Sequence, residues 1–143
     1  MIVPDVNLLL YATDAVSPHH EMAASWWAGC LSGTEVVGIP WATTLAFLRL
    51  TTNPRVYASP LSADQAIAVA RQWFAFPQVV ALDPTTRHLD ALAGLLSPTG
   101  TAGNLVTDAH LAAIAIENGA TLHSADSDFN RFPGLVWKNP LAN

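Results

Sequence analysis

Three aspartates stand out because of the segments that place them. Asp5 comes at the end of an apolar N-terminal segment that predicts a strand, and Asp126 follows another predicted strand near the other end of the chain. Asp108 lies in the first turn of a predicted Ala-rich helix. Carboxylates brought together repel one another, and a divalent cation relieves that repulsion. Oxygen ligands suit Mg²⁺ or Mn²⁺, and such an ion can orient and deprotonate water and stabilise charge developing at phosphorus.

Asp108, Asp126 and a further acid, Asp128, each also have a simpler interpretation. An aspartate in the first turn of a helix is favoured by the helix dipole, with Thr107 as the N-cap, and this explains Asp108 as well as a functional role does. Asp126 and Asp128 also fit a turn. For Asp128 the turn is the preferred interpretation.

Asp5 is harder to explain as a purely structural residue. It follows a strand containing Val and Ile and is separated by two residues from three consecutive leucines. It should therefore lie near the core, where a carboxylate needs a partner. Asn7 is a candidate to hydrogen-bond a carboxylate or a metal-bound water, and its alternative role is to cap the following helix.

The predicted elements alternate between strands and helices along the chain. Strands are predicted at Met1–Asp5, Val36–Pro40, Val79–Leu82, Ala120–His123 and Leu135–Trp137. Helices are predicted to begin at Asn7–Tyr11 and to cover Pro18–Leu31, Trp41–Thr52, Ser62–Phe76, Thr85–Leu96 and Thr107–Asn118. This alternation predicts an α/β fold with a mainly parallel sheet covered on both faces. Sites in such folds lie beyond the carboxyl ends of the strands, which is the edge where Asp5, Asp108 and Asp126 are expected.

Residues at the predicted helix ends support these boundaries. Ser17 is a plausible N-cap with Pro18 at the first helical position, and Ser62 is a second predicted N-cap. Gly119 is predicted to end the Ala-rich helix, since glycine readily adopts the left-handed conformation found at helix C-termini.

Length and composition indicate one cytoplasmic globular domain covering residues 1–143, with 51% apolar residues to build its core. No apolar stretch approaches the roughly 20 residues of a membrane helix. The N-terminus lacks the basic and apolar regions of a signal peptide. The single cysteine, Cys30, excludes an internal disulfide and is expected to be a core thiol.

The net charge of −5, with only six basic residues, argues against a broad phosphate-binding surface. A carboxylate cluster that binds a divalent metal would still be able to face a phosphate. Four arginines are expected near the proposed edge, where they could meet phosphates: Arg49, Arg55, Arg87 and Arg131. A role on a helix surface is an equal alternative for each.

The histidines offer no comparable pattern. The His19-His20-Glu21 segment lacks a third ligand at metal-binding spacing. His88, His110 and His123 are scattered in the sequence, and none pairs with a serine or cysteine in a nucleophile motif.

The order and spacing of several segments resemble those of a known family. They are residues 2–9 (IVPDVNLL), 39–41 (IPW), 47–50 (FLRL), 52–56 (TNPRV), 103–113 (GNLVTDAHLAA) and 126–135 (DSDFNRFPGL). Each segment alone is weakly specific, but the ordered set resembles the PIN-domain ribonucleases, specifically the VapC toxins of toxin–antitoxin pairs in the form abundant in mycobacteria. The resemblance spans nearly the whole chain.

This resemblance implies a PIN domain, which is a three-layer α/β/α sandwich around a mainly parallel sheet. It implies Mg²⁺-dependent RNA cleavage by activated water, with Mn²⁺ as a substitute. The family's first, third and fourth acids correspond to Asp5, Asp108 and Asp126, and Asp128 matches a further acid that some members use. The implied partners are a VapB-type antitoxin, a tRNA or rRNA substrate and a second copy of the chain in a homodimer.

One position departs from the family pattern. The family often carries a glutamate just before the Phe-Leu-Arg segment, and here that position is Ala46. A metal site would then rest on the remaining aspartates, with Asp128 or a water supplying the missing ligand. The alternative hypothesis is a catalytically weakened or inactive PIN-like module that binds RNA or protein.

Overall fold

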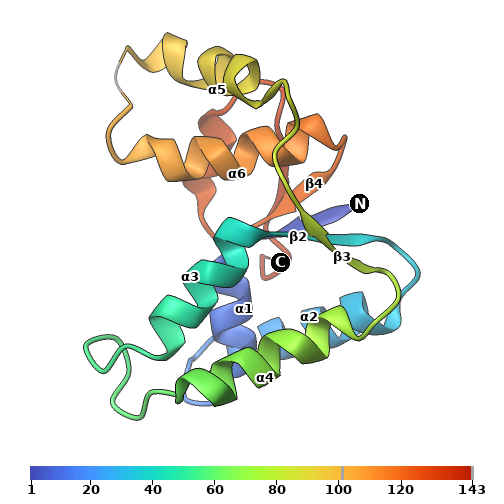
Figure 1. Ribbon diagram of the computed structural model, residues 1–143, viewed down its shortest axis with the longest axis vertical. Helices are drawn as coiled ribbons and strands as arrows, with labels where there is room; N and C mark the ends of the chain where they lie inside the picture. The colour runs from blue at the N-terminus through green and yellow to red at the C-terminus, as the bar shows by residue number, and fades with distance from the viewer. Residues whose placement is uncertain (101, 143) are drawn as a thin grey trace.

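The computed structural model describes residues 1–100 and 102–142 and contains a five-stranded sheet in which every pair of neighbouring strands is parallel (Figure 1). The strands are β1 (Ile2–Pro4), β2 (Val37–Pro40), β3 (Val79–Leu82), β4 (Thr121–His123) and β5 (Val136–Lys138). Their order is β3-β2-β1-β4-β5, so β1 is central. Because the strands are parallel, their carboxyl ends meet at one edge, and Asp5 follows the central strand there.

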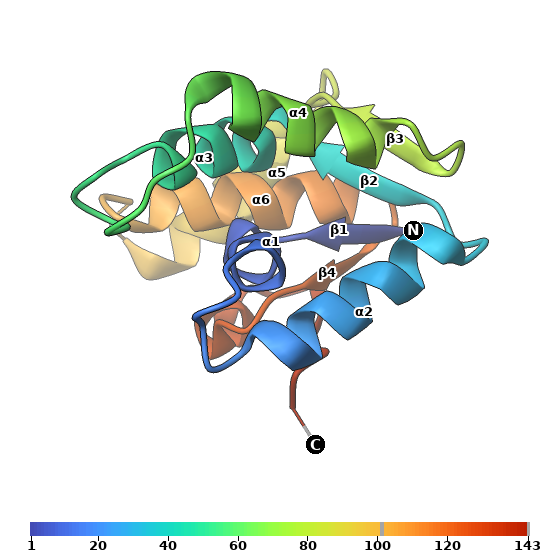
Figure 2. The same cartoon turned by 90° about the horizontal axis from the view of Figure 1, so that it is seen from below.

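Helices cover both faces of the sheet. They are α1 (Val6–Thr13), α2 (His20–Ser32), α3 (Trp41–Thr51), α4 (Ala63–Phe74), α5 (His88–Leu96) and α6 (Leu105–Glu117), with short 3₁₀ helices η1 (Ser97–Thr99) and η2 (Ser127–Arg131). Figure 1 shows α5 and α6 above the sheet and α1 to α4 below it, and Figure 2 views the molecule from the α1 to α4 side. The predicted three-layer α/β/α sandwich is confirmed, and each predicted strand and helix has a counterpart.

Each outer layer buries its own apolar cluster against the sheet. On the α1 to α4 side, the fully buried Phe47 packs in one cluster with Trp27 and Trp73. On the α5 and α6 side, Leu111 and Ile114 lie in a second cluster. Burying a side chain of this size contributes roughly 1.5–3 kcal/mol, so both layers are firmly attached to the strands that carry the aspartates.

One predicted N-cap is confirmed and another is wrong. Ser62 forms a complete capping box with Gln65, in which Ser62 Oγ accepts from the Gln65 amide at 3.1 Å and Gln65 Oε1 accepts from the Ser62 amide at 2.9 Å. Ser17 does not cap α2, which begins only at His20. Its hydroxyl accepts from the His19 amide at 3.1 Å, so it stabilises the turn before the helix.

The helix α6 begins earlier than predicted, at Leu105, so Thr107 lies inside the first turn and is not its N-cap. Its end agrees with the prediction. Gly119 has a φ of +59°, and the amides of Gly119 and Ala120 reach back to the carbonyls of Ile116 and Ala115. This is the Schellman arrangement that a left-handed glycine permits.

No helix in residues 1–100 and 102–142 is both long enough and apolar enough to span a membrane.

Candidate active site

Asp5 occupies the junction between β1 and α1. Its extended backbone (φ −81°, ψ 150°) makes it the N-cap of α1, and its Oδ1 accepts from the Val6 amide at 2.7 Å. Its own amide donates to the His123 carbonyl of the neighbouring strand β4 at 2.9 Å. Backbone hydrogen bonds on both sides therefore fix the carboxylate at the carboxyl edge of the sheet.

Ser124 was not singled out by the sequence, and it connects the two strand ends. Its side chain is fully buried, and its hydroxyl donates to Asp5 Oδ2 at 2.7 Å while accepting from the Asp126 amide at 3.0 Å. The sequence signal was present, because a serine two residues before an aspartate fits a hydroxyl-stabilised turn. What the sequence does not show is that β4 pairs with β1, which places Ser124 beside Asp5.

The pKa of Asp5 is raised above its ordinary value. Burial is the main cause, and the nearby charges of Asp108 and Asp126 add to it, while the hydrogen bonds from Ser124 and Val6 act in the opposite direction. The three aspartates predicted from the sequence are therefore close enough to act on one another.

Asp108 lies in the first turn of α6, and its charge acts on Asp5. Its pKa is raised mainly by burial, and the charge of Asp126 raises it further. Arg131 acts in the opposite direction, and Asp128 adds a smaller increase. The positive end of the helix dipole also favours the ionised form of the Asp108 carboxylate, and this effect is separate from those of the neighbouring side chains.

Asp126 and Asp128 lie on the segment after β4. The Asp126 side chain caps η2 by accepting from the Asp128 amide at 2.9 Å. The Asp128 carboxylate forms an ion pair with Arg131 at 3.3 Å and is 63% exposed. The turn interpretation of these residues therefore holds for their backbone, and Asp128 lies at the exposed margin of the acids.

Asn7 supplies an unsatisfied oxygen near these acids. Its Nδ2 donates to Ser124 Oγ at 3.4 Å, whereas its buried Oδ1 has no hydrogen-bond partner in the described structure. A buried acceptor without a partner is uncommon and calls for a water, an ion or a ligand. The prediction that Asn7 serves the carboxylates or their ligand gains support from this geometry.

The helix α3 is attached to the strand end that precedes Asp5. Thr43 Oγ1 donates to the Pro4 carbonyl at 3.3 Å, which holds α3 against the end of β1. Ala46 lies three residues after Thr43 and so shares its side of the helix. The position where the resembling family often has a glutamate therefore offers only a methyl group.

A family model for the PIN domain matches residues 2–135. The chain belongs to the PIN-domain family. It is 46% identical to Ribonuclease VapC37 and 45% identical to Ribonuclease VapC33 of Mycobacterium tuberculosis, covering 99% of this chain and of each relative. At this identity the chain belongs to the VapC branch of the family.

Solved structures of related PIN-domain proteins share the fold. The structure of VapBC-1 from nontypeable Haemophilus influenzae has a TM-score of 0.69 at 19% identity, covering 99% of this chain and 100% of that one. Mycobacterium tuberculosis VapC20, described as a sarcin-ricin loop cleaving toxin, has a TM-score of 0.65 at 18% identity and covers 95% of this chain and 99% of that one.

The oxygen ligands available in this PIN domain are of the type that a hard divalent cation prefers. Their positions provide only part of a coordination shell. Carboxylates that raise each other's pKa and an unpaired amide oxygen are suitable ligands for Mg²⁺ or Mn²⁺. Within the described residues, however, no three His, Cys, Asp or Glu side chains are positioned to hold a metal ion together. The side chains therefore require adjustment, or help from Asn7 and water, to complete a coordination shell.

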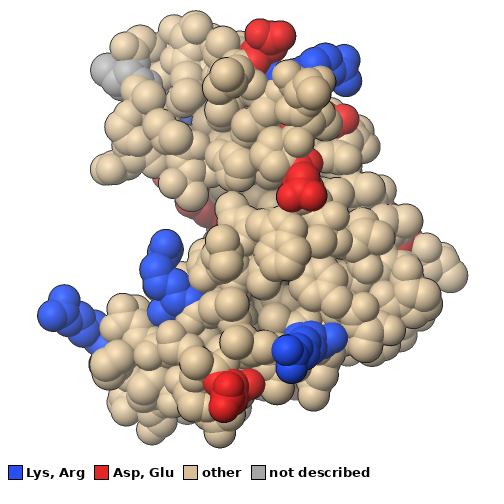
Figure 3. Space-filling view, viewed as in Figure 1, with Lys and Arg blue, Asp and Glu red and all other residues tan. Residues whose placement is uncertain are grey.

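The surface of the PIN domain is hollowed between the α5–α6 layer and α3. In the space-filling view, acidic side chains lie within this hollow and basic side chains project on its α3 side (Figure 3). The chain has two basic residues in the segment from α3 to the start of α4, Arg49 in the last turn of α3 and Arg55 in the loop after it. Arg87 precedes α5, and Arg131 ends η2.

Two of the histidines that are scattered in the sequence lie together in the structure. His88 Nδ1 lies 2.6 Å from Glu117 Oε2, and His88 Nε2 lies 2.8 Å from His110 Nδ1. The same carboxylate accepts from the amide and the hydroxyl of Thr85. The helix α5 begins at His88, three residues later than predicted, and Thr85 lies in the loop before it. This network joins α5 to α6.

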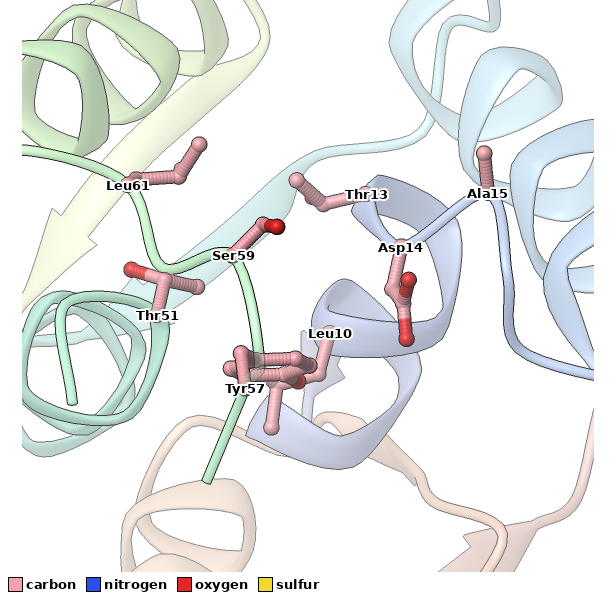
Figure 4. Close-up of a pocket in the computed structure, with 8 residues that line it drawn as sticks. All are labelled: Leu10, Thr13, Asp14, Ala15, Thr51, Tyr57, Ser59 and Leu61. Atoms are coloured by element: carbon pink, nitrogen blue, oxygen red, sulfur yellow. The ribbon is translucent and has the colours of Figure 1, made fainter. Parts of the chain in front are cut away.

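Two other polar features do not involve the side chains of the four candidate aspartates. Trp26 Nε1 donates to His123 Nδ1 at 3.1 Å, and burial together with the charge of Lys138 lowers the pKa of His123 to about 4. A small pocket of about 120 Å³ lies between α1 and the loop after α3, with Asp14 and Tyr57 among its lining residues (Figure 4). None of the four candidate aspartates lines this pocket.

Proposed function

We propose that this chain is the toxic endoribonuclease of a toxin–antitoxin pair, which cleaves RNA with a Mg²⁺-activated water and accepts Mn²⁺ as a substitute. The observation that carries the proposal is the partly buried carboxylate of Asp5, which Ser124 and the Val6 amide hold at the sheet edge and whose pKa is raised by burial and by Asp108 and Asp126 from two other segments. Asp5, Asp108 and Asp126 are the proposed catalytic and metal-binding residues, and Asp128 is a weaker metal ligand.

Two of the proposed ligands, Asp5 and Asp126, are held by hydrogen bonds from groups that this chain supplies. Ser124 and the Val6 amide fix the two oxygens of Asp5, and the Asp128 amide fixes Asp126. Asn7 directs an unpaired oxygen into the same region. A bound divalent ion would supply a nucleophilic water and neutralise charge on the phosphate. Asp5, Asp108 and Asp126 are each partly exposed, so an ion and a phosphate would be able to reach them from solvent.

The proposed partners follow from the relatives. The named relatives are ribonucleases, and one solved neighbour is a VapBC complex of Rickettsia felis bound to promoter DNA. These names support a VapB-type antitoxin as the inhibitor and an RNA as the substrate. A tRNA or rRNA as the target and a homodimer as the state of the toxin are proposed from the resemblance of the sequence to this family. Residues 1–143 are proposed to form one domain that acts in the cytoplasm.

The proposal is tested by cleavage of structured tRNA and rRNA fragments by purified protein in Mg²⁺. Wild type is compared with Asp5→Ala and Asp108→Ala, and with Asp64→Asn, an exposed aspartate on α4, as the control. Since even indirect supports of a metal ligand are worth 10–100-fold, each alanine variant is expected to lose about 100-fold or more. Cleavage by the alanine variants at the wild-type rate would contradict the proposal.

A second candidate function is a weakened or inactive module that binds RNA or protein. It is favoured by Ala46 and by the lack of a ready-made set of three ligands among the described residues. Mn²⁺ titration separates the two functions. The nuclease requires binding at millimolar or lower concentrations that Asp5→Ala removes. The inactive module predicts no such binding in wild type and a gain in Ala46→Glu.

A further inference from the structure

Arg131 is a basic residue whose charge acts on Asp108, which is half-buried. It lowers the pKa of Asp108, in opposition to Asp126 and Asp128. Its guanidinium is held from one side only, because Nε donates to the Asp128 carbonyl at 3.1 Å and Nη2 pairs with the Asp128 carboxylate at 3.3 Å. In the described part of the chain, Nη1 has no hydrogen bond or ion pair, and the side chain is 41% exposed.

The segment that carries Arg131 is rigidly seated. Phe129 and Phe132, on either side of it, are 2% and 4% exposed and belong to the core cluster of the α5–α6 layer. The Asp126 side chain caps the first residues of the same turn. Arg131 is therefore directed by a fixed backbone, although exposed ion pairs alone stabilise a protein by less than about 1 kcal/mol.

A single-stranded or looped RNA brings one negative charge with each nucleotide, and the four aspartates repel it. A divalent ion would neutralise the phosphate at the reacting position only. Neighbouring phosphates need separate cations, and the chain has only six Lys and Arg residues to provide them. A guanidinium presents its donors in a planar fork that matches two phosphate oxygens.

We propose that Arg131 is a substrate-positioning residue that binds an RNA phosphate adjacent to the scissile one, and that Asp128 holds its guanidinium in place for this contact. The inference rests on the proposed function, since it assumes that RNA lies over the aspartates. It also assigns Asp128 to orienting Arg131, which explains why this acid lies at the exposed margin of the site.

The first test measures binding of a labelled single-stranded RNA oligonucleotide to the full chain in EDTA, so that no metal-dependent cleavage occurs. Arg131→Gln is expected to raise Kd about fivefold to tenfold and to reduce the slope of log Kd against log salt by about 1. Arg131→Lys retains the positive charge but lacks the planar fork of donors, so its Kd should lie between those of wild type and Arg131→Gln. The control is Arg71→Gln, which changes an arginine on α4 that lines a separate apolar groove, and it is expected to keep the wild-type Kd. Equal Kd values for Arg131→Gln and wild type would overturn the inference.

The second test separates positioning from a structural role. As a phosphate contact, Arg131→Gln should weaken RNA binding while Mn²⁺ binds equally well or more tightly, because a positive charge near Asp108 has been removed. If Arg131 only held η2 in place, the variant would lose RNA and Mn²⁺ binding together with a lower Tm, and this outcome would overturn the inference. Asp128→Asn should raise the RNA Kd and lower Mn²⁺ affinity less than Asp5→Ala does, because Asp128 is the weaker ligand. An unchanged RNA Kd for Asp128→Asn would contradict its role in holding Arg131.

Failure of this inference and failure of the proposed function give different results. Wild type that cleaves RNA while Arg131→Gln retains the wild-type Kd overturns only the role of Arg131. If wild type does not cleave RNA in Mg²⁺ but Arg131→Gln still weakens RNA binding, the proposed nuclease function is contradicted and the phosphate contact is supported.

Discussion

Ser124 donates its hydroxyl hydrogen to Asp5 across 119 positions of the sequence, with Oγ and Oδ2 2.7 Å apart. The same oxygen accepts from the Asp126 amide, so one buried hydroxyl fixes a side chain after β1 and the backbone after β4. The relation between these two residues links the pairing of two strands to the geometry of the proposed active site.

Replacing Ser124 tests this link. Ser124→Ala leaves the Asp5 carboxylate and the Asp126 amide without their partner, so the free energy of unfolding should fall by about 1–3 kcal/mol. RNA cleavage should fall about 10–100-fold, as expected when the support of a ligand is lost. Rates and urea unfolding are measured beside Ser32→Ala, an exposed serine on α2 whose loss should change neither. Unchanged cleavage by folded Ser124→Ala would show that Asp5 does not need this hydrogen bond.

Removing one carboxylate should stabilise the metal-free protein. Burial and mutual repulsion raise the pKa values of Asp5 and Asp108, so their ionised forms cost stability when the pH is above the raised values. That cost disappears as the pH falls through the raised values and is absent below the ordinary value of 3.8. In EDTA at neutral pH, Asp108→Asn should therefore have a Tm a few degrees above that of wild type, and the difference should close in acid. A lower Tm for Asp108→Asn at neutral pH would contradict the repulsion.

Divalent metal should reverse the order of the two Tm values, so that wild type becomes the more stable protein. A ligand that binds only the folded state stabilises it in proportion to RT ln(1 + [L]/Kd), so Mg²⁺ or Mn²⁺ should raise the Tm of wild type. Asp108→Asn should gain less, and Ala46→Glu should gain more because it restores an acid on the Thr43 side of α3. Equal metal-induced shifts in wild type, Asp108→Asn and Ala46→Glu would show that the ion binds elsewhere.

Glu117 should matter for stability. Its side chain is only 4% exposed, and although burial alone would raise its pKa, the hydrogen bonds from Thr85 and His88 lower it below the ordinary value. A lowered carboxyl pKa contributes stability that is present above the ordinary value of 4.5 and is lost as the pH falls through the lowered one. Glu117→Gln should cost about 1–3 kcal/mol near neutral pH and less in acid. Urea unfolding across pH measures this, with Glu35→Gln as a control, since Glu35 is 59% exposed and forms a surface ion pair with the N-terminus.

The sequence alone determined the order of strands and helices, because these depend on local patterns of apolar residues and on residues such as Ser62 and Gly119 that act over one turn. It also grouped Asp5, Asp108 and Asp126, since parallel strands must end at one edge. The family match adds that this arrangement is a PIN domain.

Only the tertiary structure decided which neighbours those aspartates have. The contact of Ser124 with Asp5 and the pairing of His88 with Glu117 join segments far apart in the chain. The unpaired oxygen of Asn7 likewise results from how these segments pack around it. No local pattern encodes them, because each depends on which strands pair and how the helices pack on the sheet. The ion pair between Asp128 and Arg131 is local in sequence, but its position beside Asp108 depends on the burial of Phe129 and Phe132 against the core.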